Sequence, residues 1–238
     1  MKKIDTSNRT QEIEIMDDFD LEGAELKEAL DKIAKINQFL GGNKLTLQGL
    51  TILLKNADKA AEIVIVDIGC GNGDMLRYIA EFGIQNQYNF KLIGVDANAF
   101  TINYALELSK EYSNISYKCM DIFDKAFEDI KYDIILATLT LHHFENQKII
   151  SLLKVFYKNS RFGIVINDLH RNIIAYRLFQ LVCFVFSLNT MSKNDGLTSI
   201  LRGFKKQELQ EFCKRLNFKK YSIQWKWAFR HQWIIWKS

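Results

Sequence analysis

Proline is absent from all 238 residues of the sequence, and no two of its four cysteines form a Cys-x-x-Cys pair. Without such a pair, a structural zinc site or a dithiol redox site is unsupported. The longest apolar run, residues 171–189, contains Arg177 and Gln180 and falls short of the ~20 clean apolar residues of a membrane span. Met1–Thr10 shows no secretory signal, and a net charge of +4 indicates no particular polyanionic partner. We therefore expect a protein of the reducing cytoplasm with one α/β domain and some additions.

What the sequence does have is a buried strand that runs into a glycine-rich loop. Residues 63–68 form a β-branched run interrupted only by Asp67, as in a strand buried on both faces of a parallel sheet. Gly69, Gly71 and Gly73 follow, and they permit φ > 0 and a close approach of the backbone to a ligand. A helical pattern comes next, so the loop lies at a helix N-terminus, where open α/β sheets bind nucleotide-like ligands.

A second strand, residues 91–96, ends in Asp96. An acidic side chain there is suited to accept hydrogen bonds from ribose hydroxyls. The dinucleotide fingerprint requires a small residue at its sixth position, where this sequence has Asp74. The loop therefore argues against NAD as the ligand, although a nucleotide-dependent oxidoreductase is not excluded by the sequence. A structural turn with a solvated aspartate is the other interpretation of these residues.

The Asp-x-Gly-Cys-Gly-x-Gly loop and the Gly-Val-Asp strand end resemble motifs I and II of the class I S-adenosylmethionine-dependent methyltransferases. The resemblance implies a Rossmann-like, mostly parallel sheet of seven strands with the last one antiparallel. It also implies S-adenosyl-L-methionine as cofactor, S-adenosyl-L-homocysteine as product, and no need for a metal. Asp121 would bind the adenine amino group, although it could instead cap a helix. The cofactor contacts implied for this sequence are Asp67, Gly69, Cys70, Gly71, Gly73, Asp96, Ala97, Asp121, Ile122, Thr138 and Leu139.

The chain divides into an N-terminal addition, residues 1–58, and a core, residues 59–238. The first 20 residues have the composition of a loose arm. Two helices follow, and they either fold over the cofactor site or only cover the sheet edge. An insertion at about residues 170–203 carries an apolar helix that forms a lid or, alternatively, a peripheral membrane contact, and then a polar, glycine-containing stretch. We expect strands at 63–68, 91–96, 115–120, 132–138, 162–167, 219–225 and 229–236, and helices at 24–39, 45–57, 73–84, 98–111, 124–129, 145–158, 171–189 and 205–216.

The end of the fourth strand narrows the substrate class. Enzymes that methylate amide or exocyclic base nitrogens usually carry an Asn/Asp-Pro-Pro-aromatic motif there, whereas this proline-free chain has residues 137–140, Ala-Thr-Leu-Thr. The Leu-His-His that follows resembles small-molecule enzymes of the ubiquinone/menaquinone type. Residues 36–42, 167–171 and 194–209 resemble bacterial methyltransferases of polyketide and aromatic-pigment pathways. These resemblances imply a hydrophobic small-molecule acceptor.

Methyl transfer to a phenol requires a deprotonated oxygen, and histidine suits a general base at neutral pH. We predict His143 or His170 as this base, with a purely structural role for each as the alternative. His142, Arg171 and Phe179 are the predicted substrate contacts.

The resulting hypothesis is O-methylation of an aromatic, polyketide or quinol-like small molecule. Its rivals are a protein or RNA methyltransferase and a non-catalytic SAM- or nucleotide-binding protein. No nucleic-acid partner is expected. Trp225, Trp227, Trp233 and Trp236 would form a homodimer contact if they are exposed.

Overall fold

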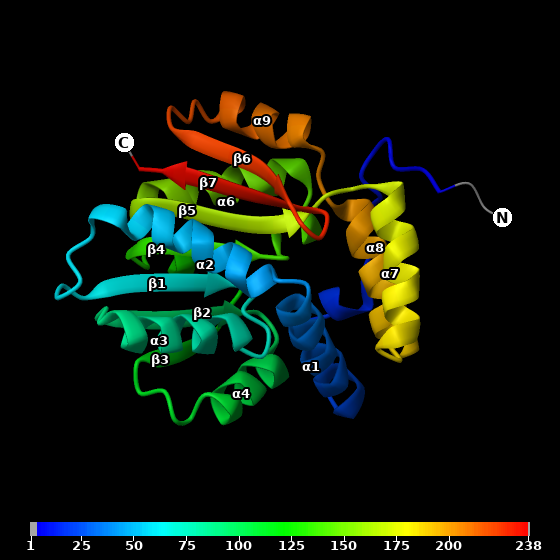
Figure 1. The fold of residues 1–238 in the computed structure, drawn as a ribbon, viewed down its shortest axis with the longest axis horizontal. Helices are drawn as coiled ribbons and strands as arrows, with labels where there is room; N and C mark the ends of the chain where they lie inside the picture. The colour runs from blue at the N-terminus through cyan, green and yellow to red at the C-terminus, as the bar shows by residue number, and fades with distance from the viewer. Residues whose placement is uncertain (1–3, 238) are drawn as a thin grey trace.

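The computed structural model describes residues 4–237, which form one seven-stranded sheet in the order β3-β2-β1-β4-β5-β7-β6 (Figure 1). β1 to β5 run parallel, and β7 runs antiparallel to both of its neighbours, β5 and β6. The predicted Rossmann-like sheet with an antiparallel last strand is therefore confirmed. The strands are β1 (Ile63–Ile68), β2 (Phe90–Asp96), β3 (Ile115–Cys119), β4 (Tyr132–Thr138), β5 (Ser160–Leu169), β6 (Tyr221–Lys226) and β7 (Arg230–Trp236).

Helices cover both faces of this sheet because its central strands are apolar on both sides. In β1, Ile63 and Ile65 face one buried cluster, and Val66 and Ile68 face the other. The first face is covered by α2 (Gly42–Leu53), which continues into the short helix η2 (Leu54–Asn56), and by α3 (Asp74–Asn86) and α4 (Ala99–Leu108). The second face is covered by α5 (Lys125–Glu128), α6 (Asn146–Asn159) and α9 (Lys206–Arg215).

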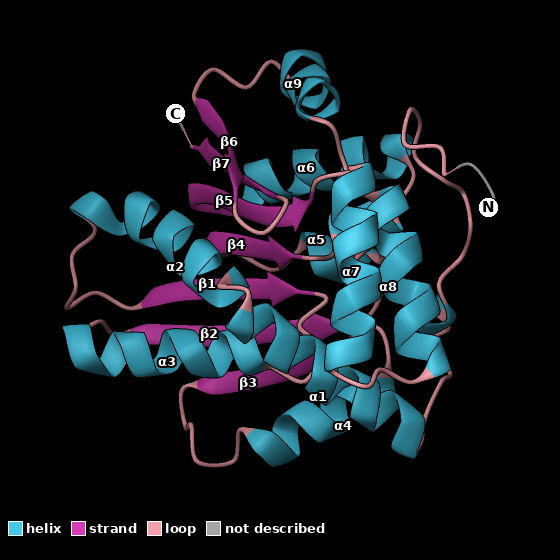
Figure 2. Ribbon diagram, turned by 45° about the vertical axis from the view of Figure 1, so that its right-hand side comes forward, coloured by secondary structure: helices cyan, strands magenta, loops and turns pink. Residues whose placement is uncertain are grey.

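Beyond the carboxyl ends of the strands lie α1 (Ala24–Phe39), α7 (Ile173–Val185) and α8 (Thr190–Arg202) (Figure 2). The sequence predicted one apolar helix here and a polar stretch after it, whereas the structure has two helices packed together. Gly196 weakened the case for a helix at residues 190–202, because glycine is a poor helix former. In the structure, its missing side chain allows α8 to pack closely against α7. A Cβ at this position would lie 2.3 Å from Cζ of Phe179 on α7.

The N-terminal arm, residues 4–22, is not loose, contrary to the prediction from its composition. It crosses the edge of α8, where the Thr10 N–H donates to the Leu201 carbonyl at 3.2 Å. It contains the short helix η1 (Ile15–Asp17), whose first two N–H groups donate to the Asp195 carboxylate. Glu14, just before η1, is only 4% exposed.

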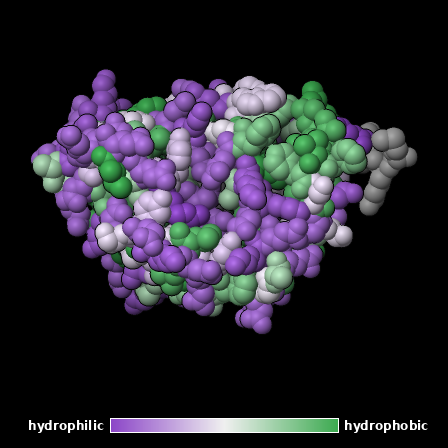
Figure 3. Space-filling model, turned by 60° about the horizontal axis from the view of Figure 1, so that its bottom comes forward, coloured by the Kyte–Doolittle hydropathy of each residue, from purple (hydrophilic) through white to green (hydrophobic). Residues whose placement is uncertain are grey.

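Exposed apolar side chains gather on α7 and form a patch at one end of the molecule (Figure 3). Within residues 4–237, no helix is both long and apolar enough to cross a membrane. A lid role and a peripheral membrane contact both stay predictions. The patch consists of Ile173, Ile174, Leu178, Leu181, Phe184 and Val185.

Two smaller expectations from the sequence need correction. Trp233 is fully buried against Phe212, so it cannot belong to the suggested dimer contact, although Trp225 and Trp227 are exposed. The sequence also places Cys119 in a predicted buried strand, residues 115–120, where a cysteine acts as a small hydrophobe. In the structure Cys119 is exposed at the end of an outer strand.

Candidate functional site

A single cavity of about 1500 Å³ lies between the carboxyl ends of the central strands and a cover made by the N-terminal arm, α1, α7 and α8. Sites for one small ligand usually measure ~300–1000 Å³. The cavity therefore has room for two ligands side by side. We call its two parts the glycine-loop end, lined by the loops after β1, β2 and β3, and the histidine end, lined by the loop after β4, the arm and α8.

The loop after β1 shapes the glycine-loop end. Gly69, Gly71 and Gly73 all have positive φ, of +60°, +53° and +77°. A Cβ at Gly69 would lie 2.8 Å from the side chain of Thr140, so only glycine fits there. Gly73 is the N-cap residue just before α3 and does not line the cavity. Its missing side chain lets the Tyr117 hydroxyl approach the loop.

Asp96 holds this loop from the neighbouring strand. Its carboxylate accepts from the Gly71 N–H and from the Asn98 N–H, both at 3.1 Å. Burial raises the pKa of Asp96. Its neighbour Ala97 also lines the cavity, as the sequence led us to expect.

Asp67 lies beneath the loop and is 2% exposed. Asp67 lines the cavity, and its buried Oδ1 atom has no hydrogen-bond partner within residues 4–237. Burial raises the pKa of this carboxyl well above its usual range, and the nearby Asp74 and Asp96 add to the effect. A buried polar atom of this kind requires a donor from a ligand or a water. This orphaned acceptor, together with the space left at Gly69, fits a polar cofactor.

Asp121 and Ile122 line the same end of the cavity, after β3. Oδ1 of Asp121 accepts from the Phe123 N–H at 2.9 Å, which makes a local turn, and this bond does not engage the other oxygen. The turn and a contact to an adenine amino group are therefore compatible.

The chain after β4 is held in a strained conformation between the two ends. Thr138 and Leu139 both line the cavity, and Leu139 has a φ of +55°, which is rare for a branched residue. The Leu139 N–H donates to the Asn167 carbonyl, and the Thr140 hydroxyl donates to the Ile68 carbonyl. These bonds fix the turn that directs the next residues into the cavity.

His142 and Asp168 form a buried pair at the histidine end. His142 Nδ1 lies 2.7 Å from Asp168 Oδ1, and the His142 backbone N–H donates to Oδ2 of the same carboxylate. Because the carboxylate accepts, Nδ1 carries the proton and the lone pair of the neutral ring lies on Nε2. Nε2 has no hydrogen-bond partner in the described part of the chain, and the ring is 2% exposed. Burial opposes ionisation of Asp168, but His142 holds the pKa of this carboxyl below its ordinary value.

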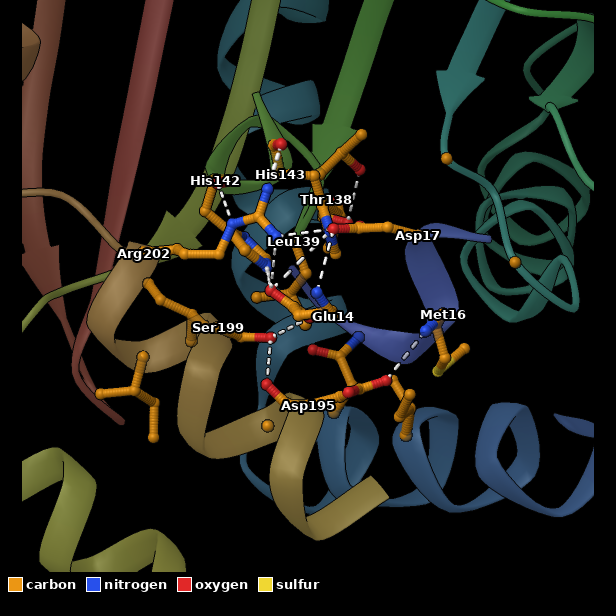
Figure 4. Close-up of a pocket in the computed structure, with 18 of the residues that line it drawn as sticks. Glu14, Met16, Asp17, Thr138, Leu139, His142, His143, Asp195, Ser199 and Arg202 are labelled. Atoms are coloured by element: carbon orange, nitrogen blue, oxygen red, sulfur yellow. Dashed lines mark hydrogen bonds and ion pairs between the residues drawn. The ribbon is translucent and has the colours of Figure 1, made fainter. Parts of the chain in front are cut away.

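Two carboxylates of the arm face the histidines (Figure 4). Oε1 of Glu14 lies 3.9 Å from His142 Nε2 and 3.8 Å from His143 Nδ1, and Oε2 of Glu14 accepts from the Ser199 hydroxyl. Burial raises the pKa of Glu14 to about 7. Asp17 is bonded to His143 Nδ1 at 2.5 Å.

Arg202 of α8 ties the histidine end together. It donates to the His142 and His143 carbonyls and, at 2.6 Å, to Asp17 Oδ2. Burial alone would raise the pKa of Asp17, but its bonds to His143 and Arg202 hold that pKa far below the ordinary value.

Of the other predicted substrate and base residues, Phe179 and His170 line the cavity and Arg171 does not. Phe179 lines the cavity from α7. His170 also lines it, but its Nδ1 accepts from the Trp225 indole N–H at 3.1 Å, so the neutral ring carries its proton on Nε2. Burial lowers the pKa of His170. Arg171 is 1% exposed, lies outside the cavity and is bound to Glu208 and the Gly203 carbonyl, so the structure does not support it as a substrate contact.

Sequence reasoning missed several members of the histidine end. Glu14 and Asp17 lie in the stretch that was interpreted as a loose arm, and Arg202 lies in the stretch interpreted as non-helical. The alternation of Ile13, Glu14 and Ile15 was the only local hint of order there. Asp168 was missed as the partner of His142 because the fifth strand was predicted to end at residue 167. β5 in fact continues to Leu169 and includes Asp168.

Residues 59–219 match the family model described as "Methyltransferase domain". The chain is 34% identical over 89 residues to putative methyltransferase 235L of Invertebrate iridescent virus 6, a match covering 37% of this chain and 31% of that protein. It is 23% identical over 160 residues to the chloroplastic tocopherol O-methyltransferase of Arabidopsis thaliana, covering 61% of this chain and 44% of that protein. The chain thus spans less than half the length of these two relatives.

Among solved structures, the plantazolicin methyltransferase BpumL in complex with SAH is similar to this chain with a TM-score of 0.68. The superposition covers 89% of this chain and 90% of the other at 19% sequence identity. At this identity the likeness establishes the fold alone.

Proposed function

The chain belongs to the methyltransferase-domain family, and from this premise we propose that it transfers a methyl group from S-adenosylmethionine to a hydroxyl of an apolar, aromatic small molecule. Bound S-adenosylmethionine supplies a methyl group already activated by the sulfonium. The chain's own task is to place the acceptor in line with the S–CH₃ bond and to exclude water.

The glycine-loop end supports the cofactor half of this proposal. Asp96 is held by two backbone N–H groups at the tip of β2, where it can accept from ribose hydroxyls. Asp121 and Ile122 would meet the adenine, and Gly69, Cys70 and Gly71 the methionine part, with Asp67 accepting from a nearby donor. The similar structure of BpumL contains SAH, in agreement with this assignment.

The observation that carries the acceptor half is the His142–Asp168 pair. It directs an unpartnered ring nitrogen into the cavity that also contains the glycine-loop end. An acceptor O–H can donate to this nitrogen, while Phe179 and the inner side of α7 provide an apolar wall. The acceptor would lose its proton at this cluster. His143 and His170 were the candidates from sequence. His170 accepts a hydrogen bond on Nδ1 and so carries its proton on Nε2, whereas His143, like His142, bonds a carboxylate through Nδ1 and stays a candidate base beside His142.

Titration of the purified protein with S-adenosylhomocysteine by calorimetry tests the cofactor half. We expect micromolar binding that weakens at least ~100-fold in Asp96→Ala, because two charge-assisted bonds to the ribose, each ~1.5–3 kcal/mol, are lost. Asp58→Ala, which removes an exposed carboxylate far from the cavity, should bind like the wild type.

No binding to a folded wild-type protein would refute the proposal. If binding is found, release of S-adenosylhomocysteine is then measured with a panel of phenols, quinols and matching carboxylic acids. Turnover of the acids alone would contradict the choice of a hydroxyl acceptor.

A further inference from the structure

Two buried hydrogen-bond acceptors face each other at the histidine end with nothing bonded to either. Oε1 of Glu14 and Nε2 of His142 are 3.9 Å apart, on side chains that are 4% and 2% exposed. Neither atom has a hydrogen-bond partner within residues 4–237, although Glu14 Oε1 also lies 3.6 Å from Arg202 Nη1. Two lone pairs that share one buried space repel each other unless a donor or a cation lies between them.

A third possible ligand atom faces the same space. His143 Nδ1 lies 3.8 Å from Glu14 Oε1, and one ligand atom from each of the three residues lies within 4.8 Å of the other two. Metal–ligand bonds of ~2.0–2.2 Å place tetrahedral ligands about 3.4 Å apart. The two distances to Glu14 Oε1 would therefore shorten by about half an ångström, and the distance between the two histidine ligand atoms, which is within 4.8 Å, by at most about 1.4 Å. His143 would exchange its bond to Asp17 for the cation.

The surrounding residues already hold these ligands in position. The Asp168 carboxylate fixes the His142 tautomer so that the lone pair of Nε2 points into the cavity. This carboxylate–histidine arrangement is the usual support of a metal-binding histidine, because it orients the ring and raises its basicity. Ser199 holds the other oxygen of Glu14 in the same way.

The two guanidiniums nearest to the cluster are already engaged by other groups. Glu14, Asp17 and Asp168 contribute three carboxylates, and two guanidiniums, Arg9 and Arg202, lie among them. Arg202 is 3.6 Å from Glu14 Oε1, but it is already bound to Asp17 and to backbone carbonyls. Arg9 is likewise bound to the His142 and Phe144 carbonyls. Arg9 and Arg202 therefore donate their hydrogen bonds to other groups and not to Glu14 Oε1 or His142 Nε2.

We propose that Glu14, His142 and His143 bind one divalent transition-metal cation, with Zn²⁺ as the reference ion, and leave a coordination position open toward the cavity. Two imidazoles and one carboxylate form a donor set that zinc and other first-row metals accept.

The role of this cation rests on the proposed function, whereas its binding does not. The acceptor oxygen would take the open position, where the cation would favour loss of the hydroxyl proton to solvent. The oxygen then forms the new bond to the methyl carbon as the S–CH₃ bond breaks, and S-adenosylhomocysteine leaves as a neutral thioether. With the cation bound, His142 Nε2 would be a metal ligand and would not accept the proton of the acceptor hydroxyl.

The test is calorimetric titration of the EDTA-treated and dialysed protein with ZnCl₂, together with a visible spectrum in CoCl₂. We expect one site with a micromolar or lower Kd and Co²⁺ absorption bands typical of a nitrogen and oxygen site. Binding should weaken at least ~100-fold in His142→Ala and in Glu14→Gln, which keeps the size of the side chain. It should weaken about 10- to 100-fold in Asp168→Asn, since loss of a supporting carboxylate has that effect.

His170→Ala is the matched control, because it removes a histidine that lines the same cavity but lies outside the cluster. It should retain the wild-type Zn²⁺ affinity within about threefold. S-adenosylhomocysteine titrations of each variant show that the glycine-loop end is intact.

The proposal is overturned if the wild type has no single Zn²⁺ site, or if His142→Ala and Glu14→Gln both bind Zn²⁺ with the wild-type affinity. A water or the acceptor hydroxyl would then lie between Glu14 Oε1 and His142 Nε2. Zn²⁺ binding without S-adenosylhomocysteine binding upholds the metal site and refutes the proposed function. The reverse result refutes the metal site alone.

Discussion

The two ends of the cavity are built by different means. At the glycine-loop end, the lining residues directly follow β1, β2 and β3, and backbone N–H groups and positive φ angles give the shape. At the histidine end, side chains from the arm, β5 and α8 meet, and buried charges give the shape. The Ser199–Glu14 bond joins residues 185 positions apart. The first end depends on local sequence, and the second on the packing of distant segments.

The largest effect that this comparison predicts is that of Gly69→Ala. The added Cβ would lie 2.8 Å from Thr140, at a φ of +60°, in the space where a ligand approaches. We expect the affinity for S-adenosylhomocysteine, measured by calorimetry, to fall about 100-fold or more, which is about 3 kcal/mol.

Gly41→Ala is the control for Gly69→Ala. Gly41 has a φ of +77°, but a Cβ there meets no atom within 4 Å. It should cost about 1 kcal/mol of stability through backbone strain and leave the affinity unchanged. Equal losses of affinity in the two variants would mean that strain, and not space, governs this end.

The next effect is a pH dependence of the free energy of unfolding that arises at the histidine end. His231 on β7 lies beneath the histidine end, beside His170. Burial lowers the pKa of His231 to about 4, with help from His170 and Lys206 and against Asp168. The unfolded chain binds this proton below pH ~6.5 and the folded chain does not, so stability falls as the pH falls from about 6.5 toward 4.

Between pH 7.5 and pH 5, this one histidine should remove about 2 kcal/mol from the free energy of unfolding. His231→Phe should therefore lose about 2 kcal/mol less than the wild type over the same interval, as measured by urea denaturation. An unchanged pH dependence would show that His231 is protonated in the folded protein.

The smallest effect is that of Arg202→Lys. Lysine keeps the charge opposite Asp17 but lacks the fork that also reaches the His142 and His143 carbonyls. We expect a loss of about 1 kcal/mol in the free energy of unfolding in urea. The affinity for S-adenosylhomocysteine should stay within about twofold of the wild type. A parallel fall in that affinity would show that the two ends are coupled and the comparison fails.

The same contrast explains what could be predicted from the sequence. Asp67, Gly69 and Asp96 could be found because each stands at the end of a strand with a clear apolar pattern. Parallel strands bring such ends to one edge of the sheet. The antiparallel place of the last strand came from the family resemblance, because hydrophobic patterning does not give the direction of a strand.

The histidine end could be predicted only in part. His142 and His143 follow a strand and were found, but the partner that orients His142 was not, since Asp168 was expected beyond the fifth strand. Glu14 lies in a stretch with too few apolar residues to indicate burial, and its surroundings come from α8. Arg171 follows Asp168 by three residues, but the chain turns after Leu169, and the Arg171 side chain reaches Glu208 on α9 instead.

The hydrogen bond between Thr10 and Leu201 has a consequence for the time course of folding. Contacts between residues so far apart form late, because they close a loop of nearly the whole chain. During synthesis, β1 to β5 can pair and the glycine loop can form while α8 is still inside the ribosome. The nascent protein would then bind its nucleotide-like ligand before it has a place for the acceptor, and the last step of folding would create the second site.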